Sequence, residues 1–163
     1  MMNEALKEVR DLLATSMSGR GIAAFYAGDI GTPAKGNLPC IIVREVSTRA
    51  GRQSTSSDQY IFGISVLLIT DIFASADVAG IQNNTVASRE RLRVLMEEGD
   101  TTGAPKTDTV LGTFMKQANI RGSNFVYNLN GRIDYRPPAP HGFTLAAAEL
   151  TLDVITDFVK RTA

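Results

Sequence analysis

Residues 149–158 alternate between apolar and polar side chains more strictly than any other part of the chain. Leu150, Leu152, Val154 and Phe158, with Thr156, occupy one set of alternate positions, and the other set carries Glu149, Thr151, Asp153 and Asp157. A period of two is typical of a strand with one face against a core. We therefore predict a sheet that contains this strand. Its acidic face is expected to contact water or an aqueous channel, and the alternation does not separate these two cases.

Three further segments have strand-like sequences. Residues 40–46 are rich in β-branched side chains, and residues 59–70 are apolar at nearly every position, which predicts a strand buried on both faces. Residues 22–26 form a short apolar run that ends in glycine, aspartate and proline, all of which favour turns. The sequence thus predicts one short and two longer strands in the first half of the chain.

A hairpin is predicted in the second half. Asn130–Gly131 separates two strand-like segments, residues 125–129 and 132–136. This dipeptide suits the positive backbone angles of a type I′ turn, so we expect the two segments to pair with each other.

Helical spacing appears in three places. Residues 3–16 place their leucines and Val9 on one face of an amphipathic helix, and residues 85–98 form a second helix that precedes Gly99, a residue typical of helix C-termini. Thr107 and Asp108 offer side-chain oxygens as N-caps for a short third helix.

These elements predict one α+β domain that spans residues 1–163. Its sheet is expected to be mostly antiparallel or mixed, with long strands and two to three flanking helices. The chain has 163 residues, of which 44% are hydrophobic, and this is enough for one core without disulfide bonds or bound metal ions to hold it together. Cys40 is the single cysteine, so no intrachain disulfide can form. The first residues carry charges and lack a long apolar run, so we expect a soluble, cytosolic protein that does not insert into membranes.

The segment of residues 47–58 contains no large apolar side chain. We expect an exposed hairpin loop between the two long strands. Loops of this length are uncommon unless they are functional or disordered, so the segment is either a contact element or a merely solvated connection.

No catalytic, cofactor-binding or metal-binding residue is predicted. His141 is the single histidine and Cys40 opens an apolar strand, so neither a Cys–His pair nor a zinc site is expected. The three acids of the last strand could form a paired-carboxylate site, but a solvated strand face is the simpler interpretation. Seventeen basic and 17 acidic residues leave no net charge to attract free nucleic acid. These observations predict a protein that is not an enzyme.

The order of elements resembles that of the tail terminator and tail-completion proteins of long-tailed bacteriophages, including the related neck proteins that join head and tail. The likeness extends over nearly the whole chain. It consists of an amphipathic first helix, the strand that follows PCIIV, a polar loop, the strand YIFGISVLLIT, the helix ASRERLRVLMEE and the final AAAELTLDVITDF.

This resemblance implies a virion protein that assembles in the host cytoplasm and acts mechanically. Proteins of this family form a hexameric ring that caps the finished tail tube, stops its polymerisation and leaves a channel through which DNA passes. The partners implied are other copies of the chain, the tail tube protein, the sheath where there is one, and neck or connector proteins. No cofactor is implied.

A head-to-tail ring interface joins two different surfaces, which can carry opposite charges. The basic contact candidates are Arg44, Arg49 and Arg52, and the acidic ones are Asp71, Asp77, Glu97 and Glu98, beside Asp100. Glu149, Asp153 and Asp157 are the candidates for a channel wall that repels DNA.

Two other interpretations stay open. The chain could be another phage component, such as a neck, head-closure, tube or baseplate subunit. It could also be an α+β domain that binds a small ligand or acts as an enzyme, which predicts a concave apolar pocket with convergent polar groups.

Overall fold

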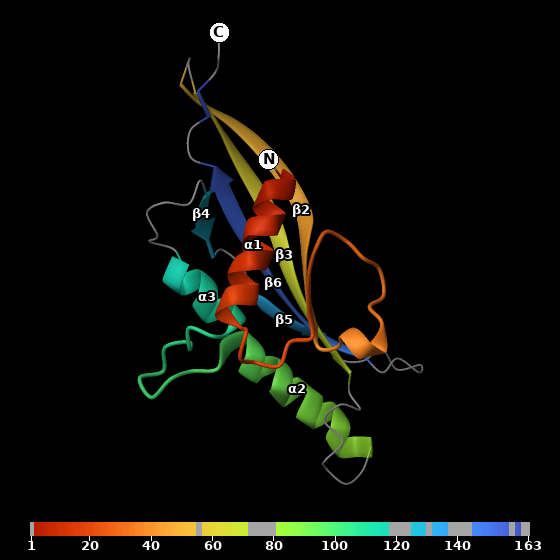
Figure 1. The fold of residues 1–163 in the computed structure, drawn as a ribbon. Coiled ribbons are helices and arrows are strands. Elements are labelled where there is room, and N and C mark those ends of the chain that lie inside the picture. The colour runs from red at the N-terminus through yellow and green to blue at the C-terminus, as the bar shows by residue number, and fades with distance from the viewer. Residues whose placement is uncertain are drawn as a thin grey trace.

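The computed structural model describes residues 2–54, 57–71, 81–117, 125–129, 132–136, 145–156 and 159–160. In this part of the chain, three helices pack against one face of a twisted sheet (Figure 1). The sheet is mixed, because its first strand runs parallel to the second and all other pairs are antiparallel. The predicted single α+β domain is therefore confirmed.

Three long strands form the centre of the sheet, in the spatial order β2-β3-β6, and shorter strands pair at their edges. The strands are β1 (Ala24–Ala27), β2 (Cys40–Ser54), β3 (Ser57–Asp71), β4 (Phe125–Asn128), β5 (Ile133–Arg136), β6 (Leu145–Thr156) and β7 (Val159–Lys160). β1 pairs with β2, while β4 and β5 both pair with β6, and β7 pairs with the start of β3.

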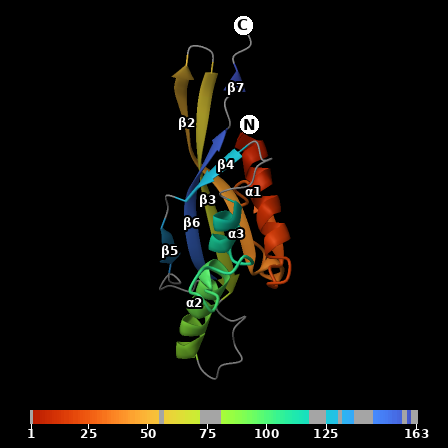
Figure 2. The same cartoon turned by 90° about the vertical axis from the view of Figure 1, so that its left-hand side faces the viewer.

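The helices are α1 (Met2–Ser16), α2 (Ile81–Glu97) and α3 (Val110–Gln117), and a short 3₁₀ helix, η1, covers Lys35–Asn37. α1 crosses the front of the sheet, α3 lies beside the lower half of α1, and α2 lies below both (Figures 1 and 2). The three predicted helices are thus present. None of the described helices is both long and apolar enough to cross a membrane.

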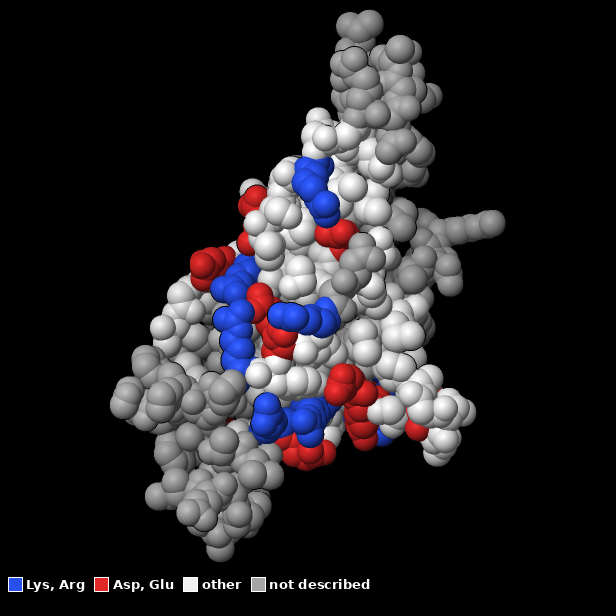
Figure 3. Space-filling view, turned by 180° about the vertical axis from the view of Figure 1, so that it is seen from behind, with Lys and Arg blue, Asp and Glu red and all other residues white. Residues whose placement is uncertain are grey.

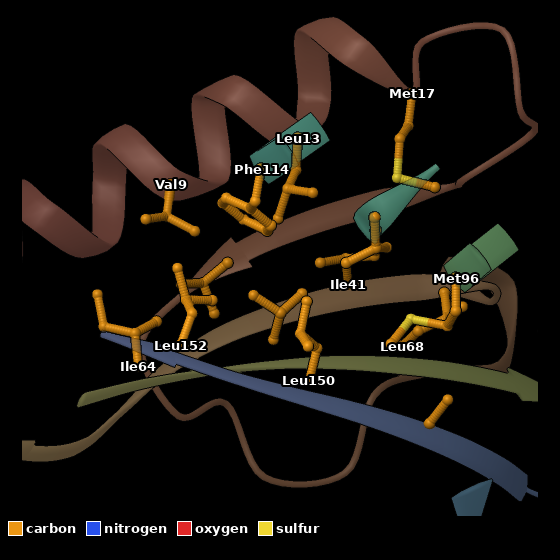
Figure 4. Close-up of a cluster of buried hydrophobic side chains, with 14 of the residues drawn as sticks. Val9, Leu13, Met17, Ile41, Ile64, Leu68, Met96, Phe114, Leu150 and Leu152 are labelled. Carbon is orange, nitrogen blue, oxygen red and sulfur yellow. The ribbon is translucent and has the colours of Figure 1, made fainter. Parts of the chain in front are cut away.

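The main core lies between this helical layer and the sheet. Figure 4 shows Val9 and Leu13 of α1, and Met17 directly after it, pointing toward Ile41, Ile64, Leu68, Leu150 and Leu152 of the strands, with Met96 of α2 and Phe114 of α3 beside them. All of these side chains are buried. Their burial follows from the two periodicities read in the sequence, 3.6 residues for α1 and 2 residues for β6.

The apolar face predicted for the last strand is confirmed as far as the structure describes it. Leu150, Leu152 and Val154 are each at most 1% exposed and face the helices. Glu149 and Asp153 lie on the opposite face of the sheet, as the alternation requires. Phe158 and Asp157 lie outside the described residues.

The N-cap of α3 differs from the prediction. The hydroxyl of Thr109, not the side chain of Thr107 or Asp108, accepts a hydrogen bond from the Gly112 N–H at 3.0 Å. Asp108 instead binds Arg20, and the Thr107 carbonyl accepts a bond from Ser16. Thr109, the residue directly before Val110, is therefore the N-cap of α3.

The loop predicted for residues 47–58 is instead the outer part of a β-hairpin. β2 continues to Ser54 and β3 begins at Ser57, and the pairing runs from Arg49 opposite Ile61 to Ser54 opposite Ser57. Figure 2 shows this ribbon projecting beyond the helical layer. A polar sequence indicates exposure and not a loop, because backbone hydrogen bonds make the ladder and a ribbon outside the core needs no apolar face.

The hairpin predicted at Asn130–Gly131 is wrong. β4 and β5 do not pair with each other; β4 pairs with residues 153–156 of β6 and β5 with residues 147–150. Both are antiparallel to β6, so they run in the same direction along one of its edges. The long free edge of β6 accommodates both strands in succession, and this competes with local hairpin pairing.

Candidate functional site

The face of the sheet away from the helices carries a group of interleaved charges. We call it the charged sheet face and define it by Arg44, Arg49, Ser65, Asp134, Arg136, Glu149 and Asp153. Strand alternation and register place these side chains together: Asp134 of β5 stands opposite Glu149 of β6, and Arg44 of β2 stands opposite Ser65 of β3. Figure 3, seen from behind, shows basic and acidic side chains next to one another on this side of the molecule.

Glu149 is the centre of this face. One of its carboxylate oxygens accepts hydrogen bonds from the Ser65 hydroxyl at 2.6 Å and from the Arg44 guanidinium at 3.2 Å. Its other oxygen accepts a bond from Arg136. The Glu149 side chain is only 11% exposed, although it lies on an outer face of the sheet. Three strands, β2, β3 and β5, therefore supply the partners of one acid on β6.

These contacts set the pKa of Glu149. Burial acts to raise the pKa, but the hydrogen bonds from Ser65 and Arg44, together with the positive charges of Arg136 and Arg44, outweigh it and hold the pKa below the ordinary glutamate value. Glu149 is therefore ionised at neutral pH. A permanently charged carboxylate is suited to an ion-pair network and not to proton transfer near pH 7.

A second ion pair lies closer to the projecting hairpin. Arg49 contacts Asp153 at 3.3 Å, and the Arg49 side chain is 64% exposed. Arg132 and Asp134 form a more exposed pair at 2.9 Å. Solvent-exposed ion pairs contribute little to stability, so the exposed Arg49 and Arg132 side chains could exchange partners against another surface at small cost.

The structure therefore brings together two sets of residues that the sequence analysis assigned to different surfaces. Arg44 and Arg49 were basic contact candidates, and Glu149 and Asp153 were candidates for an acidic channel wall. Each acid has an arginine partner in the same chain. A wall built from this face would be nearly balanced in charge, which removes the physical basis expected for repelling DNA. The side chains of Arg52 and Asp157 lie outside the described part of the chain.

A second charged cluster joins the three helices. Arg20, just after α1, contacts Glu98 at 2.7 Å and Asp108 at 2.8 Å, and Lys106 contacts Glu98 at 2.7 Å. The hydrogen bond from Lys106, followed by that from Arg20, lowers the pKa of Glu98, and the hydrogen bond from Arg20 is the main cause that lowers the pKa of Asp108. Glu98 thus stabilises the chain's own fold, and a role in subunit contact would require these bonds to open.

The other acidic contact candidates are spread over the molecule. Asp71 is the last residue of β3 and is half-buried, while Glu97 is the exposed last residue of α2. Asp77 lies outside the described residues, as does His141. No single acidic surface is formed by these positions in the described structure.

Cys40 is completely buried. It packs with Ile42 and Ile69 in a small core on the charged side of the sheet, and this burial raises the pKa of its thiol to about 11. A protonated, enclosed thiol is a poor nucleophile. In the described residues, His, Cys, Asp and Glu form no group of three or more that could hold a metal ion.

An open groove lies along the outer side of α1, next to α3, and its floor and rim are formed by Glu4, Lys7, Glu8, Asp11, Leu12, Thr15, Ser16 and Thr113. The hydroxyls of Ser16 and Thr113 in this groove serve the fold. Thr113 donates to Ser16 at 2.8 Å, and Ser16 donates to the Thr107 carbonyl at 2.6 Å. The groove has a hydrophobic residue, Leu12, among charged ones, and its polar groups do not converge on one point.

Three residues that matter here were missed by sequence reasoning. Ser65 and Arg136 complete the Glu149 network, and Arg20 joins the helices. Ser65 did give a signal, because it is a polar residue inside an otherwise apolar strand. Arg136 and Arg20 gave none, since their partners are 13 and 78 residues away in the sequence.

The chain matches no protein-family model, and a search of curated proteins finds no significant relative.

Proposed function

We propose that this protein is a structural subunit of a bacteriophage tail and forms a ring at the head-proximal end. The ring stops polymerisation of the tail tube, joins the tail to the neck and leaves a channel for DNA. Its partners are further copies of the same chain, the tube protein, and neck or sheath proteins. The action is mechanical and needs no cofactor.

The observation that carries the proposal is the projecting β2–β3 hairpin. In β2, the residues from Glu45 to Gly51 are all exposed, and Val46 is 56% exposed at a bulge in the ladder. A two-stranded ribbon is only marginally stable in water by itself. A subunit that places such a ribbon outside its own core gains stability when neighbouring subunits pack against it.

Element order supports the choice of assembly. α1, β2, β3, α2 and β6 follow one another in the order of helices and strands on which the resemblance to tail terminators is based. The exposed ion pairs of the charged sheet face add a surface on which arginines and acids can exchange partners between subunits.

Electron microscopy of the purified protein, alone and mixed with tail tubes of the same phage, tests the proposal. We expect rings of about six subunits that cap one end of each tube and prevent further growth. A protein that stays monomeric by light scattering at every concentration and leaves the tubes uncapped would contradict it. Extension of the tubes would identify a tube protein, and binding at the opposite end a baseplate component.

A further inference from the structure

At one level of the sheet, both edge strands lack a pairing partner among the described strands. β1 covers only Cys40–Val43 of β2, and from Arg44 onward the outer edge of β2 pairs with no described strand. On the other side of the sheet, β4 pairs with β6 and with no second strand among those described. Unpaired strand edges are ready templates for another strand.

The register places both edges in one row. Thr48 of β2 stands opposite Phe62, Phe62 opposite Val154, and Val154 opposite Tyr127 of β4. Among the described residues, the sheet is four strands wide at this level and ends in β2 on one side and β4 on the other. Each strand is antiparallel to the next, so β4 runs opposite to β2.

The alternation of backbone groups shows which amides are free at the β2 edge. In an antiparallel ladder, successive residues turn their N–H and C=O alternately toward and away from a given neighbour. The Val43 carbonyl accepts a bond from Gly28 at 2.8 Å, so Val43, which stands opposite Val66, faces away from β3. Phe62 lies an even number of residues from Val66 on β3, so its backbone groups also point away from β2. Its partner on β2, Thr48, therefore turns its N–H and C=O away from β3, toward the outer edge.

The same reasoning applies to Ala50, which stands opposite Tyr60, and to the β4 edge. The backbone N–H and C=O of Val154 point toward Phe62 of β3 and therefore away from β4. Tyr127, the partner of Val154 on β4, accordingly turns its own N–H and C=O away from β6. Both ends of the row therefore present backbone donors and acceptors that pair with no strand in the described part of the chain.

We propose that the outer edge of β2 in one copy pairs antiparallel with β4 of the next copy, so that the sheet continues from subunit to subunit. The two edges are different surfaces on opposite sides of one sheet, and head-to-tail contacts between such surfaces close into a ring. The strand directions fit this pairing. Copies related by rotation about the ring axis keep the direction of their strands relative to that axis, so β4 of one copy meets β2 of the next antiparallel. This inference rests on the proposed ring and specifies how its subunits join.

Hydrogen exchange on the wild-type protein is the first test. In assembled rings, the amides of Thr48 and Ala50 should exchange more slowly than in the unassembled protein at the same pH, while those of Ser47 and Arg49, which face β3, should change little. Rings in which Thr48 and Ala50 exchange as fast as in the monomer would overturn the edge pairing and leave the proposed function intact. A protein that forms no ring, alone or on tail tubes, contradicts both.

Thr48→Pro is the matching substitution, with Thr48→Val as its control. Proline removes the outward N–H and costs no backbone hydrogen bond to a described strand, whereas valine keeps the N–H. Both variants lose the Thr48 hydroxyl and its bond to Glu45, so they differ at the N–H. We expect Thr48→Pro to raise the concentration needed for half-assembly about tenfold or more, and Thr48→Val to leave it nearly unchanged. Equal assembly of the two variants would contradict the inference.

Discussion

Glu149 shows how the fold makes a surface residue structural. Its carboxylate is enclosed by a serine and two arginines from neighbouring strands and is 11% exposed. The neutral form of a glutamate could not satisfy these three donors equally well, so the network depends on the charge.

Glu149→Gln is therefore expected to lower the free energy of unfolding by about 1–3 kcal/mol at pH 7, because it removes the charge opposite Arg44 and Arg136. The lowered pKa of Glu149 means that the unfolded state takes up a proton first as the pH falls. The contribution is thus present above about pH 4.3, the ordinary glutamate value, and is lost as the pH falls through the lowered pKa. Urea unfolding at a series of pH values measures both effects.

Asp134→Asn is the control for this prediction. Asp134 lies on the same face but its side chain is 49% exposed, and its partner Arg132 is more exposed still. The expected change is below about 0.5 kcal/mol. Equal losses for Glu149→Gln and Asp134→Asn would show that enclosure of the Glu149 carboxylate does not matter.

The raised pKa of Cys40 predicts that its contribution to stability is lost at alkaline pH, whereas the contribution of Glu149 is lost at acidic pH. The raised pKa of Cys40, about 11, means that the unfolded chain loses the thiol proton before the folded chain does. Stability from this group is therefore complete below about pH 8.5 and falls as the pH rises toward 11. The difference in unfolding free energy between wild type and Cys40→Ala should shrink over this range. Native Cys40 should also resist thiol reagents until the protein unfolds, and rapid labelling of folded protein would refute the enclosed thiol.

At the scale of elements, α3 depends on a close approach to the loop before it. A Cβ added at Gly112 would lie 1.8 Å from the Lys106 carbonyl oxygen, and this oxygen also accepts bonds from the Thr109 N–H and hydroxyl. The loop cannot give way without losing the contacts that cap the helix.

Gly112→Ala should therefore destabilise the protein by about 2–4 kcal/mol, even though alanine favours helices more than glycine does. Gly19→Ala is the comparison, since a Cβ there meets nothing within 4 Å. Its effect should lie within about 0.5 kcal/mol of zero. Thermal melting of both variants provides the measurement, and a Gly112→Ala variant as stable as wild type would show that the loop lies elsewhere.

At the scale of the whole molecule, we expect the body of the protein, meaning the sheet and helices around the main core, to fold without the projecting outer part of the β2–β3 hairpin. Arg49 and Ile61 face each other across the ladder. Replacing residues 50–60 by Asn–Gly joins them through a two-residue turn of the type that hairpins favour. The change keeps the fully buried core residues and removes Tyr60, which is partly buried against the core and stacks on Phe62.

The shortened protein should fold with a melting temperature within about 5 °C of wild type, because the ribbon buries little of the main core. It should no longer form rings or cap tail tubes. Circular dichroism and light scattering test the two halves of the prediction. Normal rings from the shortened protein would refute a role for the ribbon in assembly, and an unfolded product would show that the body depends on it.

Local patterns in the sequence determined the parts of the fold in which one element meets one core. Leu150, Leu152 and Val154 are buried because a strand with a period of two has one face for the core, and the leucines of α1 follow the same logic at helical spacing. The α+β class, the three helices and the buried face of β6 could all be predicted in this way.

Only the tertiary structure decided which strands meet. The sequence could not show that β4 and β5 share the edge of β6 in preference to a local turn, or that β2 and β3 stay paired through a polar segment. Pairing is decided by backbone hydrogen bonds, which every sequence can make, and by competition between distant edges. For the same reason, the arginines of β2 and the acids of β6 looked like separate surfaces in the sequence and form one network on the charged sheet face.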